Sequence, residues 1–491
     1  MRDICAAAVS AALDFGASYA DARIVLSHSR QLASRNGLLA QMDDEVTAGI
    51  GIRVLVGGAW GFASASGTTV DVASDTAWRA TEVARASALV QRRPVSLPAV
   101  TPVTGTWRTP VQTDPFSVGL AEIVEYLRSA ESGMRVDPRV RVSSAMTSAK
   151  RQNVWLVTSE GTDIEQEFTW TGAGLGAVAT NGDDAQVRSF PNSFGGQTQG
   201  GGWEVVQNLN LLARCDQVGW EAVELLSADE CPRERTQLIL DTTQLALQIH
   251  ESIGHAAELD RVYGHEAAFA GGTYLGDDRL GTFQVGSEHV NISADATLEG
   301  ALGTFGWDDE GVAAQRWMLV EQGRFTGYLD SRETAARLGN THAAHATSHG
   351  ACRSAGYHRL PLVRMVNVSL EPGNAGTLED LIRNTERGIY METNSSWSID
   401  DRRYNFQFGC ERGYLIENGV RVKLLKNPSY AGISPQFWNS CDAVCDASEF
   451  RLWGLTNCGK GQPAQLMAMS HGSSPARFRD IEVGVSRRGG R

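Results

Sequence analysis

Two histidines and one glutamate lie close together in the short sequence HESIGH, as His250, Glu251 and His255. In the common zinc-protease pattern His-Glu-x-x-His, the histidines lie about 40° apart around a helix and can bind one ion, with the glutamate as general base. Here one more residue separates the histidines, which places them about 140° apart on a regular helix. A regular helix would therefore keep the two imidazoles from binding the same ion.

A local change of helix type would remove this difficulty. An inserted residue held as a π-bulge would turn His255 back toward His250, and such bulges are often found at functional sites. Gly254, directly before His255, would make the distortion easier. Zn²⁺ bound by both imidazoles would lower the pKa of its water to about 7, and Glu251 would be the catalytic base. On the pattern alone, the alternative is two chance surface histidines near the end of a helix.

The flanking residues predict a strand followed by a helix. Residues 236–241 are rich in Leu and Ile, which indicates a short strand. Asp241 offers a side-chain oxygen that can cap the start of a helix. Leu245, Ile249 and Ile253 then recur at four-residue steps and give that helix an apolar face. The candidate catalytic side chains would thus start from a rigid support.

A catalytic zinc usually has three protein ligands and one open position, so two histidines leave one ligand to find. Cys458 is the first candidate, in the sequence NCGKGQP, whose glycines permit a tight loop; the alternative is an ordinary buried thiol. Glu258 and Asp260 compete for this position, or either could accept a hydrogen bond from a ligand histidine and fix its tautomer. His471, in a Ser-His-Gly turn, either lies near the metal or is structural.

The longer sequence HESIGHAAELD, residues 250–260, closely resembles the motif of the TldD-type metalloproteases of the TldD/PmbA family. Companion stretches cover nearly the full chain in the family's order. They are ADAR at 20–23, GIGIRVLVGGAWGFAS at 49–64, DDEG at 308–311, RMVN at 364–367, NCGKGQP at 457–463 and SHG at 470–472. The family contains a catalytic type with the histidine motif and a partner type without it, and this chain resembles the catalytic type.

The resemblance implies a zinc-dependent peptidase in which Cys458 is the third metal ligand beside His250 and His255. It also implies that unfolded or short peptides are cut inside a closed interior between two subunits. The dimer would be either a homodimer or a heterodimer with a motif-lacking, PmbA-type chain. A second hypothesis is a non-enzymatic protein in which zinc is structural and which modulates a partner such as DNA gyrase or its inhibitors.

Composition limits the other function classes. The chain has 491 residues, 42% hydrophobic and 21% charged, as expected for a globular protein of two or three domains. Its formal charge of -13 argues against a nucleic-acid partner, because such binding depends on Lys and Arg. It has no run of about 18 apolar residues, so we expect no membrane span. Eight scattered cysteines without a disulfide-like framework favour reduced thiols in the cytoplasm.

The predicted fold is α+β, with an N-terminal domain of helices and a mixed or antiparallel sheet over 1–230. A mainly β, barrel-like domain follows over 231–491 and carries the metal-motif helix at about 243–260. Predicted helices lie at 1–16, 75–89, 117–132 and 211–226, an extended linker at 92–113, and strands at 22–26, 45–56, 140–147, 153–159 and 165–179. Asn418 and Gly419 predict a hairpin turn.

Several other clusters carry less specific signals. The histidine-rich stretch 342–349 has small polar neighbours, which favours a solvated or substrate-side loop over a second metal site. The acidic run 308–310 is interpreted as structural, because consecutive side chains point in different directions. The charged run 400–403 is interpreted as a salt-linked turn and not as a catalytic dyad. The glycine-rich stretch 194–202 is interpreted as a plain surface connection, with a substrate-lining loop as the alternative.

Overall fold

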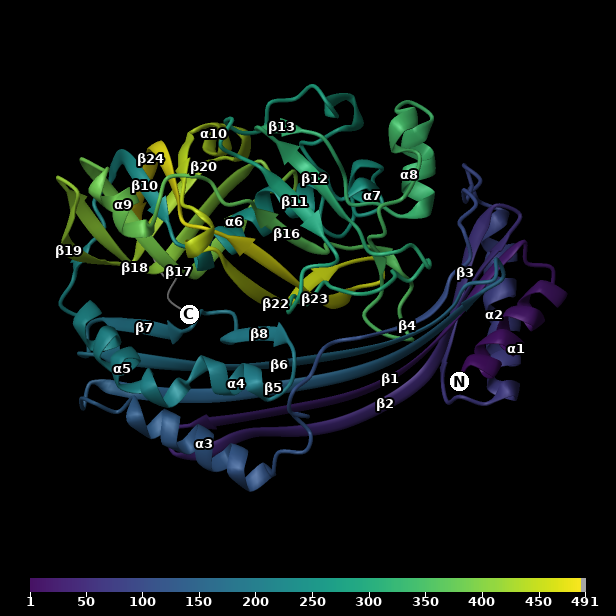
Figure 1. Ribbon diagram of the computed structural model, residues 1–491, viewed down its shortest axis with the longest axis horizontal. Coiled ribbons are helices and arrows are strands. Elements are labelled where there is room, and N and C mark those ends of the chain that lie inside the picture. The colour runs from purple at the N-terminus through teal and green to yellow at the C-terminus, as the bar shows by residue number, and fades with distance from the viewer. Residues whose placement is uncertain (487–491) are drawn as a thin grey trace.

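A computed structural model describes residues 1–486 of the protein. The N-terminal half forms a large curved sheet with helices at its two ends and along its outer side (Figure 1). The C-terminal half lies on the concave side of this sheet (Figure 1). One hydrophobic core joins them, because Val25, Val154 and Phe168 of the sheet belong to the same buried cluster as the C-terminal half.

The first sheet has the strand order β3-β2-β1-β5-β6-β4, with β7 and β8 also paired to β6. Its strands are β1 (Tyr19–Arg35), β2 (Leu38–Val56), β3 (Ala59–Ser66), β4 (Thr104–Arg108), β5 (Val140–Thr158), β6 (Asp163–Thr180), β7 (Ala185–Phe190) and β8 (Gln197–Gly200). The predicted strands 140–147 and 153–159 are one continuous strand, β5. Of the residues between them, Ser148, Lys150 and Gln152 face a cavity of about 390 Å³, called the central cavity below, which the sheet shares with the C-terminal half.

Helices cover both ends of the first sheet. They are α1 (Arg2–Asp14), α2 (Val70–Ala88), α3 (Leu120–Gly133), α4 (Glu204–Leu209), the 3₁₀ turn Leu211–Ala213 and α5 (Cys215–Leu225). Helix α2 begins earlier than predicted, because Thr69 caps it by accepting a hydrogen bond from the Val72 N–H. It approaches β3 closely: a Cβ at Gly61 would lie 2.1 Å from the Ala80 carbonyl oxygen. The linker predicted at 92–113 contributes β4, a parallel partner of β6.

The C-terminal half contains a closed barrel of strand order β17-β10-β24-β20-β18, in which β18 also pairs with β17. The barrel strands are β10 (Glu234–Leu240), β17 (Arg387–Ile399), β18 (Asn405–Glu417), β20 (Pro428–Ile433) and β24 (Ala476–Val485). The strands β9 (Asp229–Glu230), β19 (Val420–Lys426) and β21 (Cys441–Val444) extend this sheet. The predicted α+β fold with a barrel-like C-terminal part is confirmed. So is the β18–β19 hairpin, whose Asn418 and Gly419 have φ of 49° and 77°.

Smaller elements surround the barrel. A four-stranded sheet has the order β13 (Arg324–Phe325), β12 (Arg316–Glu321), β11 (Ile292–Asp295) and β16 (Asn367–Leu370). Two hairpins are β14 (Cys352–Arg353) with β15 (Leu362–Val363), and β22 (Arg451–Lys460) with β23 (Gln465–Ser473). Helices here are α6 (Thr242–Ile249), α7 (Leu259–Val262), α8 (Arg332–Gly339), α9 (Leu378–Arg383) and α10 (Ser434–Asn439). The β22–β23 hairpin lies between the barrel and the first sheet (Figure 1).

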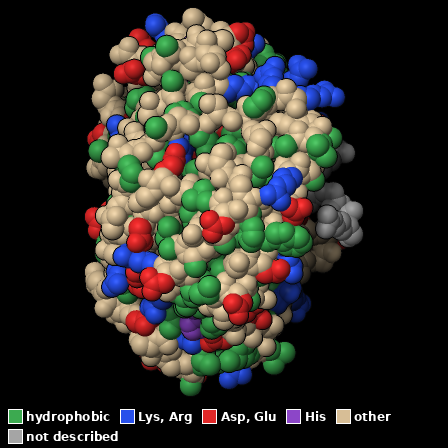
Figure 2. All heavy atoms as spheres, turned by 90° about the vertical axis from the view of Figure 1, so that its right-hand side faces the viewer, with side chains coloured by type: hydrophobic (Ala, Val, Ile, Leu, Met, Phe, Trp, Pro, Cys, Tyr) green, Lys and Arg blue, Asp and Glu red, His purple; other side chains and the backbone are tan. Residues whose placement is uncertain are grey.

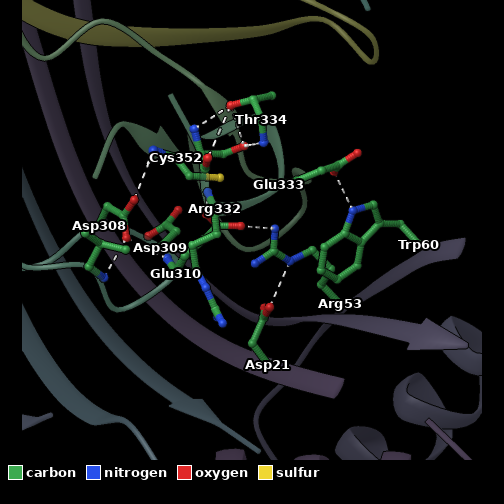
Figure 3. Close-up of polar contacts among 12 residues, drawn as sticks. Asp21, Arg53, Trp60, Asp308, Asp309, Glu310, Arg332, Glu333, Thr334 and Cys352 are labelled. Atoms are coloured by element: carbon green, nitrogen blue, oxygen red, sulfur yellow. Dashed lines mark hydrogen bonds and ion pairs between the residues drawn. The ribbon is translucent and has the colours of Figure 1, made fainter. Parts of the chain in front are cut away.

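Buried ion pairs fix the two halves to each other (Figure 3). Arg53 of β2 lies 2.8 Å from Asp21 of β1 and 3.1 Å from Glu310 of the C-terminal half. Arg23 of β1 similarly lies 2.9 Å from Asp309. These contacts agree with the structural interpretation of the acidic run 308–310. The two halves form opposite walls of the central cavity, so these ion pairs also fix the position of one wall relative to the other.

The surface carries mixed charge on the face shown in Figure 2, where acidic and basic side chains are scattered among apolar ones. One apolar edge is distinct: β3 pairs only with residues 49–56 of β2, so residues 38–48 have β1 on one side alone. Leu38, Met42 and Val46 on this edge are 70%, 49% and 63% exposed. Within residues 1–486, no helix combines the length and the apolar character needed to cross a bilayer.

Candidate metal centre

The predicted strand, cap and helix around the histidine motif are all present. Asp241 caps α6 by accepting hydrogen bonds from the N–H groups of Thr243 and Gln244, and every residue of α6 is buried. A π-helical turn, His250–Gly254, follows, as predicted. It brings the ring centroids of His250 and His255 to 4.6 Å, which a regular helix would not do.

Side chains from outside the helix support the π turn. The Tyr274 hydroxyl donates to the Ser252 carbonyl at 2.8 Å, and the Trp438 indole N–H donates to the Ser252 hydroxyl at 2.9 Å. Gly254 has an ordinary helical φ of −53°, so it is not needed for an unusual backbone conformation. It is needed for space, because a Cβ there would lie 2.3 Å from the Met365 sulfur.

Cys458 reaches the histidines from the β22–β23 hairpin. Its Sγ lies 3.6 Å from Nε2 of His255, and the ligand atoms of His250, His255 and Cys458 all lie within 4.8 Å of one another. The three residues are buried. The Arg364 guanidinium donates to the Cys458 carbonyl at 2.6 Å and so fixes the backbone that carries the thiol.

The hydrogen bonds of His471 determine which nitrogen of His250 faces the other ligands. Nδ1 of His471 lies 2.9 Å from the Val368 carbonyl, which can only accept, so this nitrogen carries the proton. Burial lowers the pKa of His471 to about 4, so the ring is neutral at pH 7 and its Nε2 is an acceptor. Nδ1 of His250, 2.8 Å away, must therefore donate to it. Nε2 of His250 is left as a free electron-pair donor.

Glu258 orients His255 in the same way. Its carboxylate accepts from Nδ1 of His255 at 2.9 Å, which leaves Nε2 to face Cys458. Cys458 and Glu258 are both candidates for the third ligand. The structure places Cys458 at Nε2 of His255, the nitrogen that is free to bind a metal, and Glu258 at Nδ1 on the opposite side of the ring. Carboxylates in that outer position raise the basicity of a ligand histidine.

Buried charges hold Glu258 ionised. Burial alone would raise its pKa, but Lys460, His255 and Arg261 outweigh burial and hold the pKa well below its usual value. Nζ of Lys460 lies 3.2 Å from Glu258 and 2.8 Å from Asp260. Asp260 therefore supports the site through Lys460, and among the described residues its carboxylate has no hydrogen bond to His250 or His255.

A metal ion fits this arrangement. Two imidazole nitrogens and one thiolate are a typical donor set for zinc, and tetrahedral Zn–N and Zn–S bonds would place N and S about 3.6 Å apart. The Nε2–Sγ distance of His255 and Cys458 is 3.6 Å. Burial lowers the pKa of His255 to about 3 and that of His250 well below normal, so both rings are neutral donors at pH 7. Burial raises the pKa of Cys458 to about 11, so a metal must displace its proton.

Glu251 lies next to the first histidine and is 7% exposed. Burial raises its pKa, while the neighbouring Arg403 lowers it. The Arg403 guanidinium donates to its Oε2 from the turn at residues 400–403. That turn is structural as predicted, because Asp400 accepts from the N–H groups of Arg402 and Tyr404. Arg403, the last residue of this turn, also contacts Glu251, the candidate general base.

Three cationic residues near the site had no role assigned from the sequence: Arg364, Arg403 and Lys460. Arg364 and Lys460 lie inside the motifs RMVN and NCGKGQP, so the motifs marked their importance but not their function. Arg403 had only the signal of a charged turn. Each of the three contacts a residue far away in the chain, and the spacing of residues along the sequence does not reveal such contacts.

Two other sequence candidates lie outside the centre. In the stretch 342–349, Nδ1 of His349 donates to the Asp330 carboxylate at 2.7 Å, and the His349 ring stacks on Trp317. This stretch contributes to no group of three candidate metal ligands among residues 1–486. The interpretation of 194–202 as a plain surface connection is wrong. It forms β8, its Gln197 bonds to the β22 backbone, and Phe194 and Thr198 line the central cavity.

Replacing Lys460 by Met is expected to lower the free energy of unfolding by about 3–5 kcal/mol, because Glu258 and Asp260 would stay buried without their shared cation. The measurement is urea unfolding followed by Trp fluorescence, with a chelator present so that metal binding does not contribute. Lys423→Met is the matched control: Lys423 is 53% exposed beside Asp229, and its loss should leave the free energy of unfolding nearly unchanged, because exposed ion pairs contribute little. Equal small losses in both variants would contradict the role given to Lys460.

Comparison with protein families matches three consecutive models to this chain. They are "PmbA/TldA metallopeptidase domain 1" at residues 20–84, the "central domain" at 113–228 and the "C-terminal domain" at 233–484. The matched regions cover most of the chain and include every residue of the candidate metal centre.

Individual proteins agree with these models. A metalloprotease of Methanothermobacter thermautotrophicus is 30% identical over 468 residues, 95% of each chain. A zinc metalloprotease TldD homolog of Saccharolobus solfataricus is 25% identical over 254 residues, 50% of this chain and 51% of the other. The fold matches a crystal structure from Thermotoga maritima with a TM-score of 0.74 and 17% identity, over 98% and 99% of the chains. That protein is named for a proposed modulation of a DNA gyrase.

Proposed function

The chain belongs to the PmbA/TldD family of metallopeptidases, and we propose that it is a zinc-dependent peptidase with His250, His255 and Cys458 as metal ligands. The observation that carries the proposal is the convergence of these three ligand atoms within 4.8 Å. In the tautomers assigned above, Nε2 of His250 and Nε2 of His255 carry no proton, so each can bind a metal. One relative is named a zinc metalloprotease, which supports zinc as the metal.

When bound, zinc would polarise a peptide carbonyl and make hydroxide available at neutral pH. Three protein ligands are typical of a catalytic zinc, because the fourth position remains open to water or substrate. His471 and Glu258 hold the two imidazoles in the tautomers that bind metal. Glu251 is the general base: it accepts a proton from the attacking water and passes it to the leaving amine. Arg403 holds the Glu251 carboxylate in position.

The substrates we propose are unfolded or short peptides. The central cavity is lined by both halves of the protein, and one of its walls is the hairpin that carries Cys458. An extended peptide binds mainly through backbone hydrogen bonds, which require little of its side chains. This favours a broad range of sequences.

We also propose that the enzyme is a dimer, of two copies or of this chain with a motif-lacking, PmbA-type chain. The half-paired edge of β2 at residues 38–48 supports this, because its unpaired backbone and its exposed Leu38, Met42 and Val46 are suited to pairing with another chain. A second subunit would enclose the peptide. The cytoplasm is the proposed location, since all eight cysteines are free and buried.

The alternative is a non-enzymatic, zinc-stabilised protein that modulates a partner such as DNA gyrase or its inhibitors. The name of the Thermotoga maritima protein favours it. A structural zinc site, however, usually has four protein ligands, whereas three converge here among the described residues. A glutamate directly after the first ligand also favours catalysis.

The test is peptide digestion by the purified protein before and after removal of metal. Cleavage of an unstructured fluorogenic peptide is expected to stop on treatment with a zinc chelator and to return on addition of one equivalent of Zn²⁺. Total metal content is measured on the same samples. Cleavage that survives complete loss of metal would refute the proposal, and bound zinc without any cleavage would favour the non-enzymatic alternative.

A further inference from the structure

The central cavity contains an uncompensated positive charge on its sheet side. Lys150 of β5 lies between Ser29 of β1 and Trp170 of β6, and its Nζ is 5.4 Å from the centre of the Trp170 ring. Its same-face neighbours on β5 are neutral, Ser148 and Gln152. No carboxylate within residues 1–486 forms an ion pair with Lys150. Its ammonium group therefore faces the cavity with only neutral neighbours on this wall.

A second cation lies on the opposite wall. The Arg353 guanidinium donates to the carbonyl of Met365 at 3.0 Å and to that of Ala468 at 3.3 Å, and it lies over the Phe305 ring at 5.5 Å. Carbonyl oxygens satisfy its hydrogen bonds without neutralising its charge. Burial lowers the pKa of Arg353 to about 10, which still leaves it cationic at pH 7.

The acids that line the cavity do not neutralise these cations. Asp309 is 2.9 Å from Arg23 and is committed to that ion pair. Asp308 accepts hydrogen bonds from the backbone N–H groups of Val312 and Cys352, and burial raises its pKa well above its usual value. The cavity thus carries excess positive charge in a protein whose net charge is -13.

We propose that the central cavity binds a carboxylate of the peptide substrate and that Lys150 is the residue that selects it. This inference rests on the proposed peptidase function and adds a preference to it. The carboxylate is either the free C-terminus of a peptide or an acidic side chain. Both present the same two oxygens to an ammonium group.

The surroundings of Lys150 make the preference strong. Burial lowers the pKa of Lys150, because its cation is partly removed from water without a counter-charge. A carboxylate would supply that charge, and a hydrogen bond between ions in such surroundings favours binding by about 10- to 100-fold over a neutral analogue. Phe168 and Trp170 beside it offer an apolar surface to the neighbouring part of the peptide.

The experiment is peptide binding by the Glu251→Gln variant of the zinc-loaded full chain, which is expected not to cut its ligand. Fluorescence anisotropy is measured with three labelled peptides of otherwise equal sequence. The first has a free C-terminal carboxylate, the second an amidated C-terminus, and the third an amidated C-terminus with one internal Gln replaced by Glu. We expect the first or third peptide to bind at least about 10-fold more tightly than the second. The one that does so identifies the source of the carboxylate.

Variants at Lys150 test the assignment of this residue. Lys150→Met should remove the difference between the charged and neutral peptides, and Lys150→Arg should preserve most of it. Lys423→Met, which removes the same charge from an exposed position beside Asp229, should leave the difference unchanged. Equal binding of all three peptides, or a preference that survives Lys150→Met, would overturn the inference.

The peptidase proposal is tested separately on the wild-type enzyme. Charge-selective binding without cleavage would sink the peptidase proposal but leave the carboxylate site standing. Cleavage by the wild type without a preference for carboxylate peptides in binding would support the peptidase proposal and refute the carboxylate site. Failure of every peptide to bind would refute the carboxylate site, because the cavity would then not accept peptides.

Discussion

Replacement of Glu251 by Gln is expected to lower kcat for peptide cleavage by about 10²- to 10⁴-fold, the usual loss when a general base is removed. The zinc content should stay the same, because the three proposed ligands are intact. Gln has nearly the same shape and can still accept a hydrogen bond from Arg403. The measurements are kcat, KM and zinc content of the purified variant, with circular dichroism to check the fold.

Glu379→Gln is the control for Glu251→Gln. It makes the same chemical change at an exposed position, where the Glu379 carboxylate forms an ion pair with Arg421, and should leave cleavage unchanged. If Glu251→Gln cleaves as fast as the wild type, another residue is the base. If the variant loses its zinc, Glu251 has a structural or ligand role instead.

Replacement of Cys458 by Ala is expected to weaken zinc binding by more than about 100-fold. Loss of a residue that only hydrogen-bonds to a metal ligand typically weakens binding by about 10- to 100-fold. Cleavage at limiting zinc should fall to background. The measurement is competition for zinc with a chromophoric chelator. Cys445→Ala is the control, since Cys445 is a fully buried thiol in a separate cluster and its loss should leave zinc affinity unchanged.

The pH dependence of zinc binding should also differ between the wild type and Cys458→Ala. The Cys458 thiol has a pKa of about 11 without metal and must lose its proton on binding. Raising the pH from 6 to 8 increases the thiolate fraction about tenfold per unit, so the apparent affinity of the wild type should rise by that factor. The histidines contribute no slope, because their pKa values are already lowered. A pH-independent affinity in the wild type would exclude Cys458 as a ligand.

Local signals in the sequence were sufficient to predict the support of the site. Asp241 caps α6 as expected, and the extra residue between His250 and His255 is taken up by a π turn. Both features depend on residues within a few positions of one another. The Asn418–Gly419 hairpin was predictable for the same reason.

Residues that act over long distances in the chain were not predictable from one sequence. Arg403 lies 152 residues from Glu251, and Arg364 lies 94 residues from Cys458, and neither had a predicted role. The strand β24, which closes the barrel, was not predicted either. Its buried residues Phe478 and Ile481 are three apart, because Asp480 adopts a positive φ of 54° and shifts the alternation by one.

The central cavity explains a third difference. Ser148, Lys150 and Gln152 interrupt the apolar alternation of β5, so the sequence predicted two strands with a break between them. In the structure the strand continues, and these polar side chains face the cavity. A polar interruption in a strand thus marked the wall of a cavity and not a loop.

The order of the ligands along the chain has a consequence for biosynthesis. A ribosome makes His250 and His255 about 200 residues before Cys458, whose separation from His255 is 203 positions. One of the two barrel strands that pair with β10, the strand directly before α6, is β24, which is translated later still. A nascent polypeptide that has not yet reached Cys458 therefore lacks one of the three proposed metal ligands.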